Sequence, residues 1–324
     1  MKKILIIGVS SFSGSSLAKY LQNKYLIYGT YCQNMKRKEY IFDKKKINLF
    51  KVDLTKDKDI LKLSNKIFSI KPSFIIDHAS VCMVQESWNF QEKYFQINVN
   101  SRIKLLNKIK NFNFLKKYIY ISTPEIFGSN DKPINEFSSN FNPSTPYANS
   151  KLAAEFILKN FTKLNGFPLI ISRFSNFYGP GQPAYRLIPK VYYSIKTNKK
   201  FPLHGDGSSK RNFLYSKDFC SGIHKIIKKG KVSKTYHFSG TKFIKISEII
   251  KLICKKYNFN FKKLVKFTKD RDHKDKIYML NCKWTKKQLD WKEKYDYKNG
   301  IYETLYYYEK KKNNSKNQLN FKMY

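Results

Sequence analysis

Short apolar runs alternate with longer amphipathic stretches in the first half of the chain, and this alternation most constrains the fold. The runs have the length of strands, and the stretches between them have the spacing of helices. They are ILIIGV (4–9), YLIYGTY (25–31), KPSFIIDHAS (71–80) and KKYIYIST (116–123), with a helix expected from Ser13 to Lys24. Continuous apolar strands joined by helices form parallel sheets covered on both faces. The sequence therefore predicts an α/β fold with a doubly wound parallel sheet, whose ligands bind beyond the carboxyl ends of the strands.

The pattern becomes less regular after PLIISRFSNFYGPG (168–181). A turn-rich stretch, LHGDGSSKRNF (203–213), is followed by helices expected near Ser216–Lys228 and Ser247–Tyr257. With 324 residues that are 41% hydrophobic, the chain can bury a full core. We predict a large Rossmann-type domain over residues 1–170, to which later segments can return, and a smaller α/β lobe over 171–308. The polar, basic stretch 309–324 is expected to be a flexible tail.

The net charge of +41 raises the question of nucleic acid. Only six of the 64 basic residues are arginine, and the lysines are spread along the chain. A nucleic-acid reader more often clusters its cations and uses the forked hydrogen bonding of arginine. We therefore expect no specific nucleic-acid partner, although non-specific attraction to polyanions is expected.

Cysteine usage and hydropathy indicate a cytoplasmic protein. The five cysteines have no CxxC spacing or histidine pairing, so neither a metal site nor a disulfide framework is expected. No apolar run approaches the roughly 18 residues that span a bilayer. The opening Met1-Lys2-Lys3 followed by ILIIGV is too short for a signal peptide and is interpreted as a buried first strand.

A glycine-containing segment lies between the first strand and the first helix. It reads Gly8-Val-Ser-Ser-Phe-Ser-Gly14. Glycines at this position let the backbone approach a pyrophosphate held at the helix N-terminus. The usual spacing has three glycines, and here Ser11 stands at the middle one. An ordinary strand-to-helix turn remains the alternative.

The second strand lacks the acidic residue that commonly binds the ribose of NAD. The stretch Gly29-Thr-Tyr-Cys-Gln-Asn34 contains no carboxylate, and Lys36, Arg37 and Lys38 follow it. These cations suit a 2′-phosphate as well as a solvated loop, so the choice between NAD and NADP stays open.

The strongest signal is Ser122-Thr-Pro-Glu-Ile-Phe-Gly128 followed by Pro143-Ser-Thr-Pro-Tyr147-Ala-Asn-Ser-Lys151. A tyrosine four residues before a lysine lies on one helical face. The ammonium can lower the pKa of the phenol and bind the nicotinamide ribose, so that Tyr147 acts as a base toward a sugar hydroxyl. An exposed helix face is the alternative in a chain rich in Tyr and Lys.

These motifs resemble those of the extended short-chain dehydrogenase/reductases in the NAD-dependent epimerase/dehydratase family. The resemblance is greatest to nucleotide-sugar 4,6-dehydratases of the dTDP-glucose and GDP-mannose types, and it covers the chain to about Tyr308. The substrate-lobe motifs SRFSNFYGPGQ (172–182), YRLIP (185–189), LHGDGSSKRNFLYSKD (203–218) and DRDHKDKIY (270–278) occur in the expected order.

The resemblance implies a tightly bound, recycled NAD(P) and a nucleotide-diphosphate sugar as substrate. The implied catalytic residues are Thr123, Glu125, Tyr147 and Lys151. The implied cofactor contacts are Gly8, Ser11, Phe12, Gly14, Asp53, Leu54, Ala79, Tyr147 and Lys151. The implied substrate contacts are Asn176, Arg186, Arg211, Arg271 and Lys276, because cations suit the diphosphate.

In such a dehydratase, Tyr147 and Lys151 run oxidation at C4, and Glu125 then removes the acidified C5 proton while water leaves from C6. Pro124 stands where the dTDP-glucose enzymes have an aspartate that protonates the leaving hydroxyl, and it has no proton to give. We expect Glu125 to deliver that proton itself, directly or through water.

Three alternatives remain open. Tyr147 and Lys151 would equally serve a nucleotide-sugar 4-epimerase or a decarboxylase of the same family, and Glu125 favours the dehydratase. An inactive relative that binds nucleotide or RNA is the alternative from another class. Residues 81–85 are more apolar than in the dehydratases, which leaves the sugar open.

Family resemblance also implies a homodimer, with the helix that bears Tyr147 and Lys151 packing against a partner subunit. Ala148, Ala153 and Ala154 on this helix would permit close approach, or would serve as plain core packing.

Overall fold

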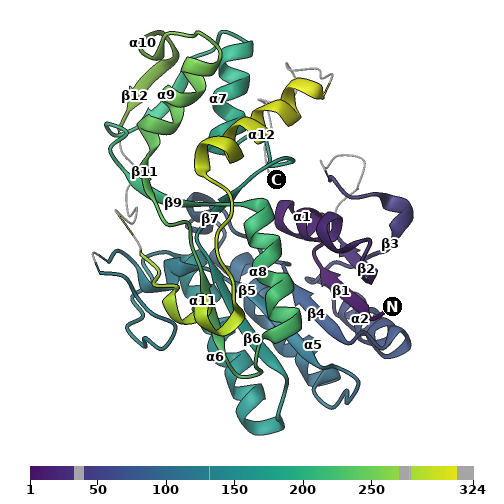
Figure 1. Ribbon diagram of the computed structural model, residues 1–324. Helices are drawn as coiled ribbons and strands as arrows, with labels where there is room; N and C mark the ends of the chain where they lie inside the picture. Colours follow the sequence, from purple (N-terminus) through teal and green to yellow (C-terminus); the bar gives the residue numbers. More distant parts are fainter. Residues whose placement is uncertain (33–39, 131, 270–276, 278, 312–324) are drawn as a thin grey trace.

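The computed structural model describes residues 1–32, 40–130, 132–269, 277 and 279–311. A seven-stranded sheet forms its larger part, and a smaller lobe lies beyond one edge of that sheet (Figure 1). None of the described helices has the length and apolar character needed to cross a membrane.

All neighbouring strands of the large sheet are parallel, in the order β10-β6-β5-β4-β1-β2-β3. The strands are β1 Lys3–Ile7, β2 Leu26–Tyr31, β3 Ile47–Lys51, β4 Phe74–Asp77, β5 Lys117–Ser122, β6 Leu169–Phe174 and β10 Thr235–Phe238. The chain winds outward from β1 to β3 and then resumes at β4 on the other side of β1. The predicted doubly wound sheet is confirmed, and its switch point lies between β1 and β4.

Successive residues of β1 enter two different cores, because side chains alternate along a strand. Ile4 and Ile6 pack with α1 (Phe12–Leu21), α8 (Ser216–Lys229) and α11 (Lys283–Leu289). Leu5 and Ile7 pack with α2 (Asp57–Ile70), α5 (Ser101–Ile109) and α6 (Pro146–Asn165). Helices therefore cover both faces of the sheet, as Figure 1 shows for α8 and α11 on one face and α5 and α6 on the other.

Short elements connect these layers. They are the 3-10 helices η2 (Lys44–Lys46) and η4 (Pro124–Phe127), the helices α3 (Val84–Ser87) and α4 (Gln91–Phe95), and the π-helical turn η3 (Gln96–Asn100). The π turn joins α4 directly to α5.

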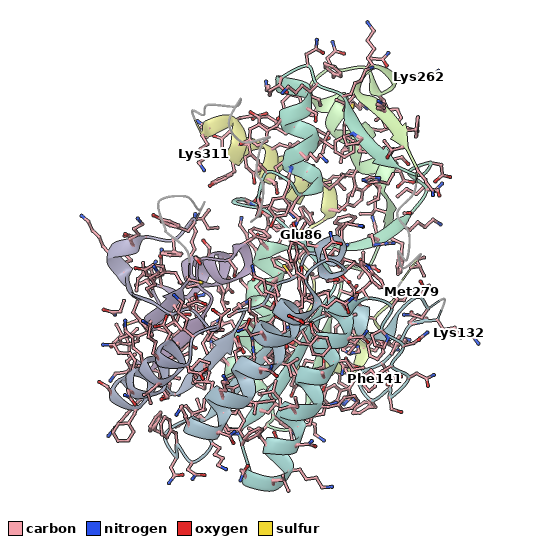
Figure 2. All side chains as sticks on the ribbon, turned by 180° about the vertical axis from the view of Figure 1, so that it is seen from behind. Glu86, Lys132, Phe141, Lys262, Met279 and Lys311 are labelled. Atoms are coloured by element: carbon pink, nitrogen blue, oxygen red, sulfur yellow. The ribbon has the colours of Figure 1, made fainter. Side chains whose placement is uncertain are left out.

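The smaller lobe has its own core, built around Val191, Ile250 and Leu305. Its strands are β7 Asn176–Tyr178, β8 Phe201–His204, β9 Lys210–Tyr215, β11 Phe243–Lys245 and β12 Val265–Thr268. Its helices are α7 Leu187–Lys196, α9 Ile246–Lys256, α10 Phe261–Leu264 and α12 Tyr297–Lys310. Strands β11-β9-β7 and β12-β8 form two small sheets. Glu86 on α3 lies where the two lobes meet, and Lys262 lies at the far end of the small lobe (Figure 2).

The chain returns to the large sheet after entering the small lobe. Strand β10 pairs with β6, and α8 and α11 cover the large sheet. Strand β6 of the large sheet runs to Phe174, beyond the predicted domain boundary at residue 170. The predicted tail lies mostly outside the described residues, which end at Lys311.

Candidate active site

The helix that carries the predicted tyrosine and lysine starts at a well-formed N-terminus. Thr145 is the N-cap of α6, and its hydroxyl accepts a hydrogen bond from Ala148 N at 3.2 Å. Pro146 follows in the first turn, where a missing N–H costs nothing. This start places Tyr147 and Lys151 on one face of α6, beside the carboxyl end of β5, and both side chains are buried.

The residues after β5 bring a hydroxyl and a carboxylate to the same place. Thr123 caps η4, accepts a hydrogen bond from Glu125 N at 3.2 Å, and shares a side-chain hydrogen bond with Tyr147. Glu125 is half-buried and lies within electrostatic range of the Tyr147 phenol. Thr123 and Glu125 therefore both lie near the Tyr147 phenol.

Burial raises the pKa of Tyr147 well above its ordinary value, and the Glu125 carboxylate and Cys82 raise it further. Only the hydrogen bond with Thr123 acts in the opposite direction among the main causes. This is opposite to the lowered pKa expected from the sequence. The physical reason is that the phenol is enclosed next to a negative charge, while the Lys151 ammonium is bound elsewhere.

Lys151 Nζ donates to the Ile121 carbonyl at 2.7 Å and lies 4.1 Å from the centroid of the Tyr120 ring. Burial lowers its pKa to about 7, and the positive charge of Arg102 adds to the lowering. The Lys151 side chain therefore changes between its charged and neutral forms near neutral pH.

A loop after β4 packs against α6, with Val81 and Tyr147 in one buried cluster. Tyr94 fixes this loop, since its hydroxyl donates to Met83 O at 2.6 Å and accepts from Met83 N at 3.1 Å. The Tyr94 ring also packs edge-on against Tyr147, with 6.3 Å between centroids. Arg186 reaches the loop from the start of α7, with Nη2 3.7 Å from Cys82 Sγ. The predicted diphosphate ligand Arg186 is thus an electrostatic neighbour of Tyr147.

The segment between β1 and α1 has the close packing that a phosphate loop needs. Gly8 has a φ of +83°, and a Cβ there would lie 3.0 Å from the Ala79 backbone. A Cβ on Gly14 would lie 2.5 Å from Gly8 O. Ser11 is the N-cap of α1: its hydroxyl accepts from Gly14 N at 3.0 Å and donates to Gly8 O at 2.8 Å.

This arrangement explains the serine at the middle glycine position. Ser11 has an extended backbone (φ −69°), which any residue adopts, and its hydroxyl caps the helix. The Phe12 side chain stacks on Phe177 at 5.1 Å, so it anchors the loop. The first-turn amides of α1 remain directed out of the helix end, as at every helix N-terminus, and suit a pyrophosphate.

Asp53 and Leu54 follow β3, at the same edge of the sheet. The Asp53 carboxylate accepts hydrogen bonds from Thr55 N at 3.0 Å and from Thr55 Oγ1 at 2.7 Å. Burial alone would raise the pKa of Asp53, but these hydrogen bonds and the charges of Lys56 and Lys51 together lower the pKa. The carboxylate thereby stabilises the turn that contains the two implied cofactor contacts, Asp53 and Leu54.

Two further predicted substrate contacts lie on neighbouring strands of the small lobe. Asn176 begins β7 and pairs with Phe213 of β9, two residues beyond Arg211. Arg211 Nη1 donates to Lys210 O at 2.9 Å. Arg271 and Lys276, and the cations at Lys36, Arg37 and Lys38, lie outside the described residues.

Several polar residues that the sequence did not single out hold this region together. The Asn98 amide donates to Val81 O and to Ser150 Oγ, and its oxygen accepts from Val81 N. Arg102 forms a buried ion pair with Asp77. The sequence could have indicated Arg102. It shares one helical face with the apolar residues Leu105, Leu106 and Ile109, and a charged residue on such a buried face is unexpected.

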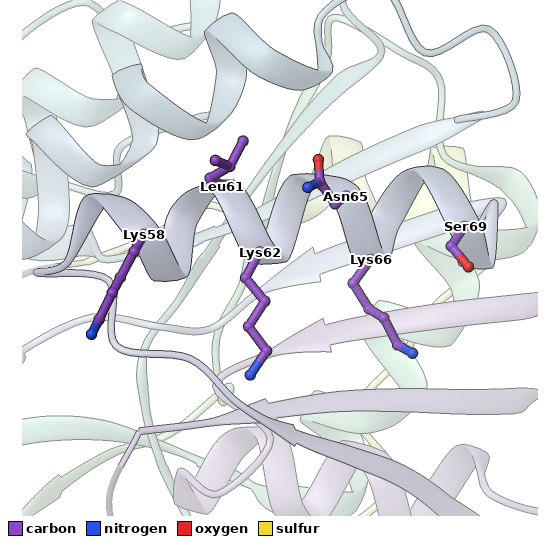
Figure 3. A pocket seen from close by; sticks show the side chains of 6 residues that line it. All are labelled: Lys58, Leu61, Lys62, Asn65, Lys66 and Ser69. Atoms are coloured by element: carbon purple, nitrogen blue, oxygen red, sulfur yellow. The ribbon is translucent and has the colours of Figure 1, made fainter.

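A shallow hollow lies on the outer face of α2, lined by Lys58, Leu61, Lys62, Asn65, Lys66 and Ser69 (Figure 3). Its lysines recur every four residues and project to one side of the helix (Figure 3). None of the candidate catalytic residues lines it. We interpret it as a solvated helix face.

Comparison with known proteins agrees with this geometry. The family model for GDP-mannose 4,6 dehydratase matches residues 5–304. The human dTDP-D-glucose 4,6-dehydratase is 31% identical over 331 residues, covering 98% of this chain and 92% of the human enzyme. A trifunctional UDP-glucose 4,6-dehydratase/UDP-4-keto-6-deoxy-D-glucose 3,5-epimerase/UDP-4-keto-L-rhamnose-reductase of Arabidopsis thaliana is 26% identical. The match covers 95% of this chain but only 47% of that plant protein, so the chain spans about half of its length.

Solved structures show the same similarity. The dTDP-glucose 4,6-dehydratase of Bacillus anthracis in complex with NAD superimposes with a TM-score of 0.84 at 28% identity, covering 96% of this chain and 98% of that one. The UDP-glucose 4-epimerase of Thermotoga maritima superimposes with a TM-score of 0.86 at 20% identity, covering 95% and 99%. This second likeness shows the shared fold.

The extent of the family match, the doubly wound sheet and the motifs after β1, β5 and at the start of α6 lead to one assignment. The chain belongs to the GDP-mannose 4,6 dehydratase family of extended short-chain dehydrogenase/reductases.

Proposed function

We propose that this protein is a nucleotide-sugar 4,6-dehydratase that uses NAD. The observation that carries the proposal is the convergence of Thr123, Glu125, Tyr147 and Lys151 beyond the carboxyl end of β5. Tyr147 and Lys151 suit oxidation of a sugar alcohol, and a simple epimerase has no use for a carboxylate beside them. Glu125 therefore favours dehydration over 4-epimerisation.

The cofactor would lie along the carboxyl edge of the sheet. Gly8, Ser11, Phe12 and Gly14 would hold its pyrophosphate through the start of α1, Asp53 and Leu54 its adenosine, and Ala79, Tyr147 and Lys151 its nicotinamide half. When bound, NAD supplies the acceptor for the C4 hydride and the donor that returns this hydride to C6.

The chain's own residues move the protons. Tyr147 takes the proton of the C4 hydroxyl, with Thr123 hydrogen-bonded beside it, and Lys151 leaves the Ile121 carbonyl to bind the ribose and lower the pKa of the phenol. Glu125 then removes the C5 proton, which the new C4 ketone has acidified. The C6 hydroxyl leaves as water with a proton from Glu125, because Pro124 has none to give. A proton equivalent to the one lost from the C4 hydroxyl finally returns to C5.

The substrate would be a nucleotide-diphosphate sugar that spans the two lobes. Asn176, Arg186 and Arg211 would contact it from the small lobe, together with Arg271 and Lys276. Arginine forks match phosphate oxygens in geometry and charge.

A cytoplasmic homodimer completes the proposal. None of the five cysteines forms a disulfide, which suits a reducing compartment. Ala148 and Ala154 are buried within the chain's own core, so their small size serves that core. Phe156, 46% exposed on α6, is the better candidate for a partner contact.

The test is Glu125→Gln. We expect this variant to oxidise C4, seen as reduced nicotinamide absorbance on adding a nucleotide hexose, but to release no water-depleted product. Glu92→Gln, at an exposed position on α4, is the matched control and should react as the wild type. Continued water loss in Glu125→Gln would show that another group is the base.

A further inference from the structure

The helix leading to the active site contains a π turn at Gln96–Asn100. Single π turns inside α-helices are frequent at functional sites. This turn places the buried Asn98 between the loop after β4 and α6, since Asn98 binds Val81 of that loop and Ser150 of α6. Arg102, the second residue of α5 after the turn, donates to Ile97 O within it.

Arg102 and Asp77 form a closed, buried ion pair. Each side chain is 2% exposed. Arg102 Nε and Nη2 donate to the two carboxylate oxygens of Asp77 at 3.0 and 3.1 Å. Asp77 also accepts from Tyr118 Oη at 2.8 Å and from Ala79 N at 3.1 Å. These hydrogen bonds hold both side chains of the buried pair in one position.

The pair connects to both halves of the proposed active site. Through Ala79, Asp77 fixes the backbone that packs against Gly8 of the phosphate loop. On the other side, Arg102 and Lys151 share Tyr120, which is an electrostatic neighbour of Arg102 and presents its ring to Lys151 Nζ. The pair therefore lies between the cofactor loop and the lysine of α6.

We propose that Arg102, held by Asp77, is a positioning residue that controls the charge and placement of Lys151 and the placement of Ala79. The inference rests on the proposed function, because it gives Lys151 a catalytic role. Arg102 itself touches neither substrate nor cofactor.

Electrostatics supports the same assignment. The pKa of Lys151 is lowered to about 7, first by burial and second by Arg102, while Asp77 raises it by less. The charged or titratable groups that face Lys151 are Asp77 of β4, His78 and Cys82 of the following loop, Arg102 of α5, Tyr120 of β5 and Glu155 of α6. Arg102 has the largest effect of these groups on the pKa of Lys151.

The test measures the titration of Lys151 by NMR in cofactor-free protein with isotopically labelled lysine. The NMR signal of Lys151 is assigned as the one that is absent from the spectrum of Lys151→Met. In the double variant Asp77→Asn with Arg102→Met, which leaves no unpaired buried charge, we expect the pKa to rise measurably. Arg102→Met alone should raise it further, by about one unit or more, because Asp77 then remains.

Two controls separate charge from general disruption. Arg102→Lys keeps the charge and should restore a pKa near the wild-type value. Lys104→Met, on the exposed side of the same helix, should change nothing. An unshifted Lys151 in the folded double variant, or a wild-type Lys151 that titrates like an exposed lysine, would overturn the proposal.

The same variants carry a catalytic readout. The alkaline limb of kcat/KM should move to higher pH together with the NMR titration. Absence of sugar turnover in the wild type, with the titration shifted as expected, would refute the dehydratase assignment and leave the effect of Arg102 on Lys151 intact.

Discussion

Lys151 is the residue at which folding and the proposed chemistry conflict most directly. Its side chain is 2% exposed, and its pKa is lowered from 10.5 to about 7, mainly by burial. A buried ammonium costs stability, and such costs concentrate at functional sites.

This cost predicts a pH-dependent gain for Lys151→Met. Because the folded pKa is the lower one, the unfolded state binds the proton more tightly, so the penalty is complete below about pH 7 and disappears as the pH rises toward 10.5. The variant should therefore gain on the order of 3 kcal/mol more in unfolding free energy at about pH 6 than at about pH 9.5. Denaturant unfolding of the cofactor-free proteins measures this, and an equal gain at both pH values would contradict it.

At the scale of residues, the sequence predicted the groupings whose members lie close together along the chain. Tyr147 and Lys151 are one helical turn apart, and Thr123 and Glu125 belong to one short turn, so their grouping follows from spacing. Arg102 and Asp77 are 25 positions apart, and only the pairing of β4 with the helix after the π turn brings them together. The raised pKa of Tyr147 also depends on tertiary burial, which spacing does not report.

At the scale of elements, the start of α1 shows how a motif survives the loss of a glycine. Ser11 needs no positive φ, and its hydroxyl satisfies Gly14 N while binding Gly8 O. The Ser11 cap thus stabilises the loop, whereas a glycine at this position would leave its backbone more conformational freedom.

Ser11→Ala and Ser11→Gly should accordingly differ. Loss of the cap in the alanine variant should cost about 1 kcal/mol of unfolding free energy, whereas glycine at an N-cap costs only a few tenths. We expect NAD binding, measured by titration of cofactor-free protein, to weaken more in Ser11→Ala. Equal destabilisation by both substitutions would show that Ser11 is not acting as a cap.

Elements with strong apolar runs or regular amphipathic spacing could be predicted, as α8 and α9 also show. The predicted strands within 4–9, 25–31, 71–80 and 116–123 are present as β1, β2, β4 and β5. Strand β9 begins within LHGDGSSKRNF, the stretch interpreted as turn-rich. The glycines and serines at the centre of this stretch indicate a turn, and strand residues occur only at its ends. The π turn has no signature in the sequence, since its residues fit an ordinary helix equally well.

At the scale of the whole molecule, the charge of +41 shapes the surface and does not identify the site. The hollow on α2 in Figure 3 illustrates this, because its lysines follow helical spacing on a solvated face. Two acidic residues of the interior, Asp77 and Glu155, are instead paired with arginine. Among the described arginines, Arg102 and Arg173 thus serve buried ion pairs.

In the proposed dehydratase, two lobes, the cofactor-binding edge of the sheet and the Glu125 carboxylate act together. The most direct test incubates the enzyme with a panel of nucleotide hexoses in deuterated water and follows the product by mass spectrometry and NMR. We predict a product lighter by one water, with one deuterium at C5. An unchanged mass with a new stereoisomer, loss of carbon dioxide, or binding of RNA without any turnover would contradict the assignment.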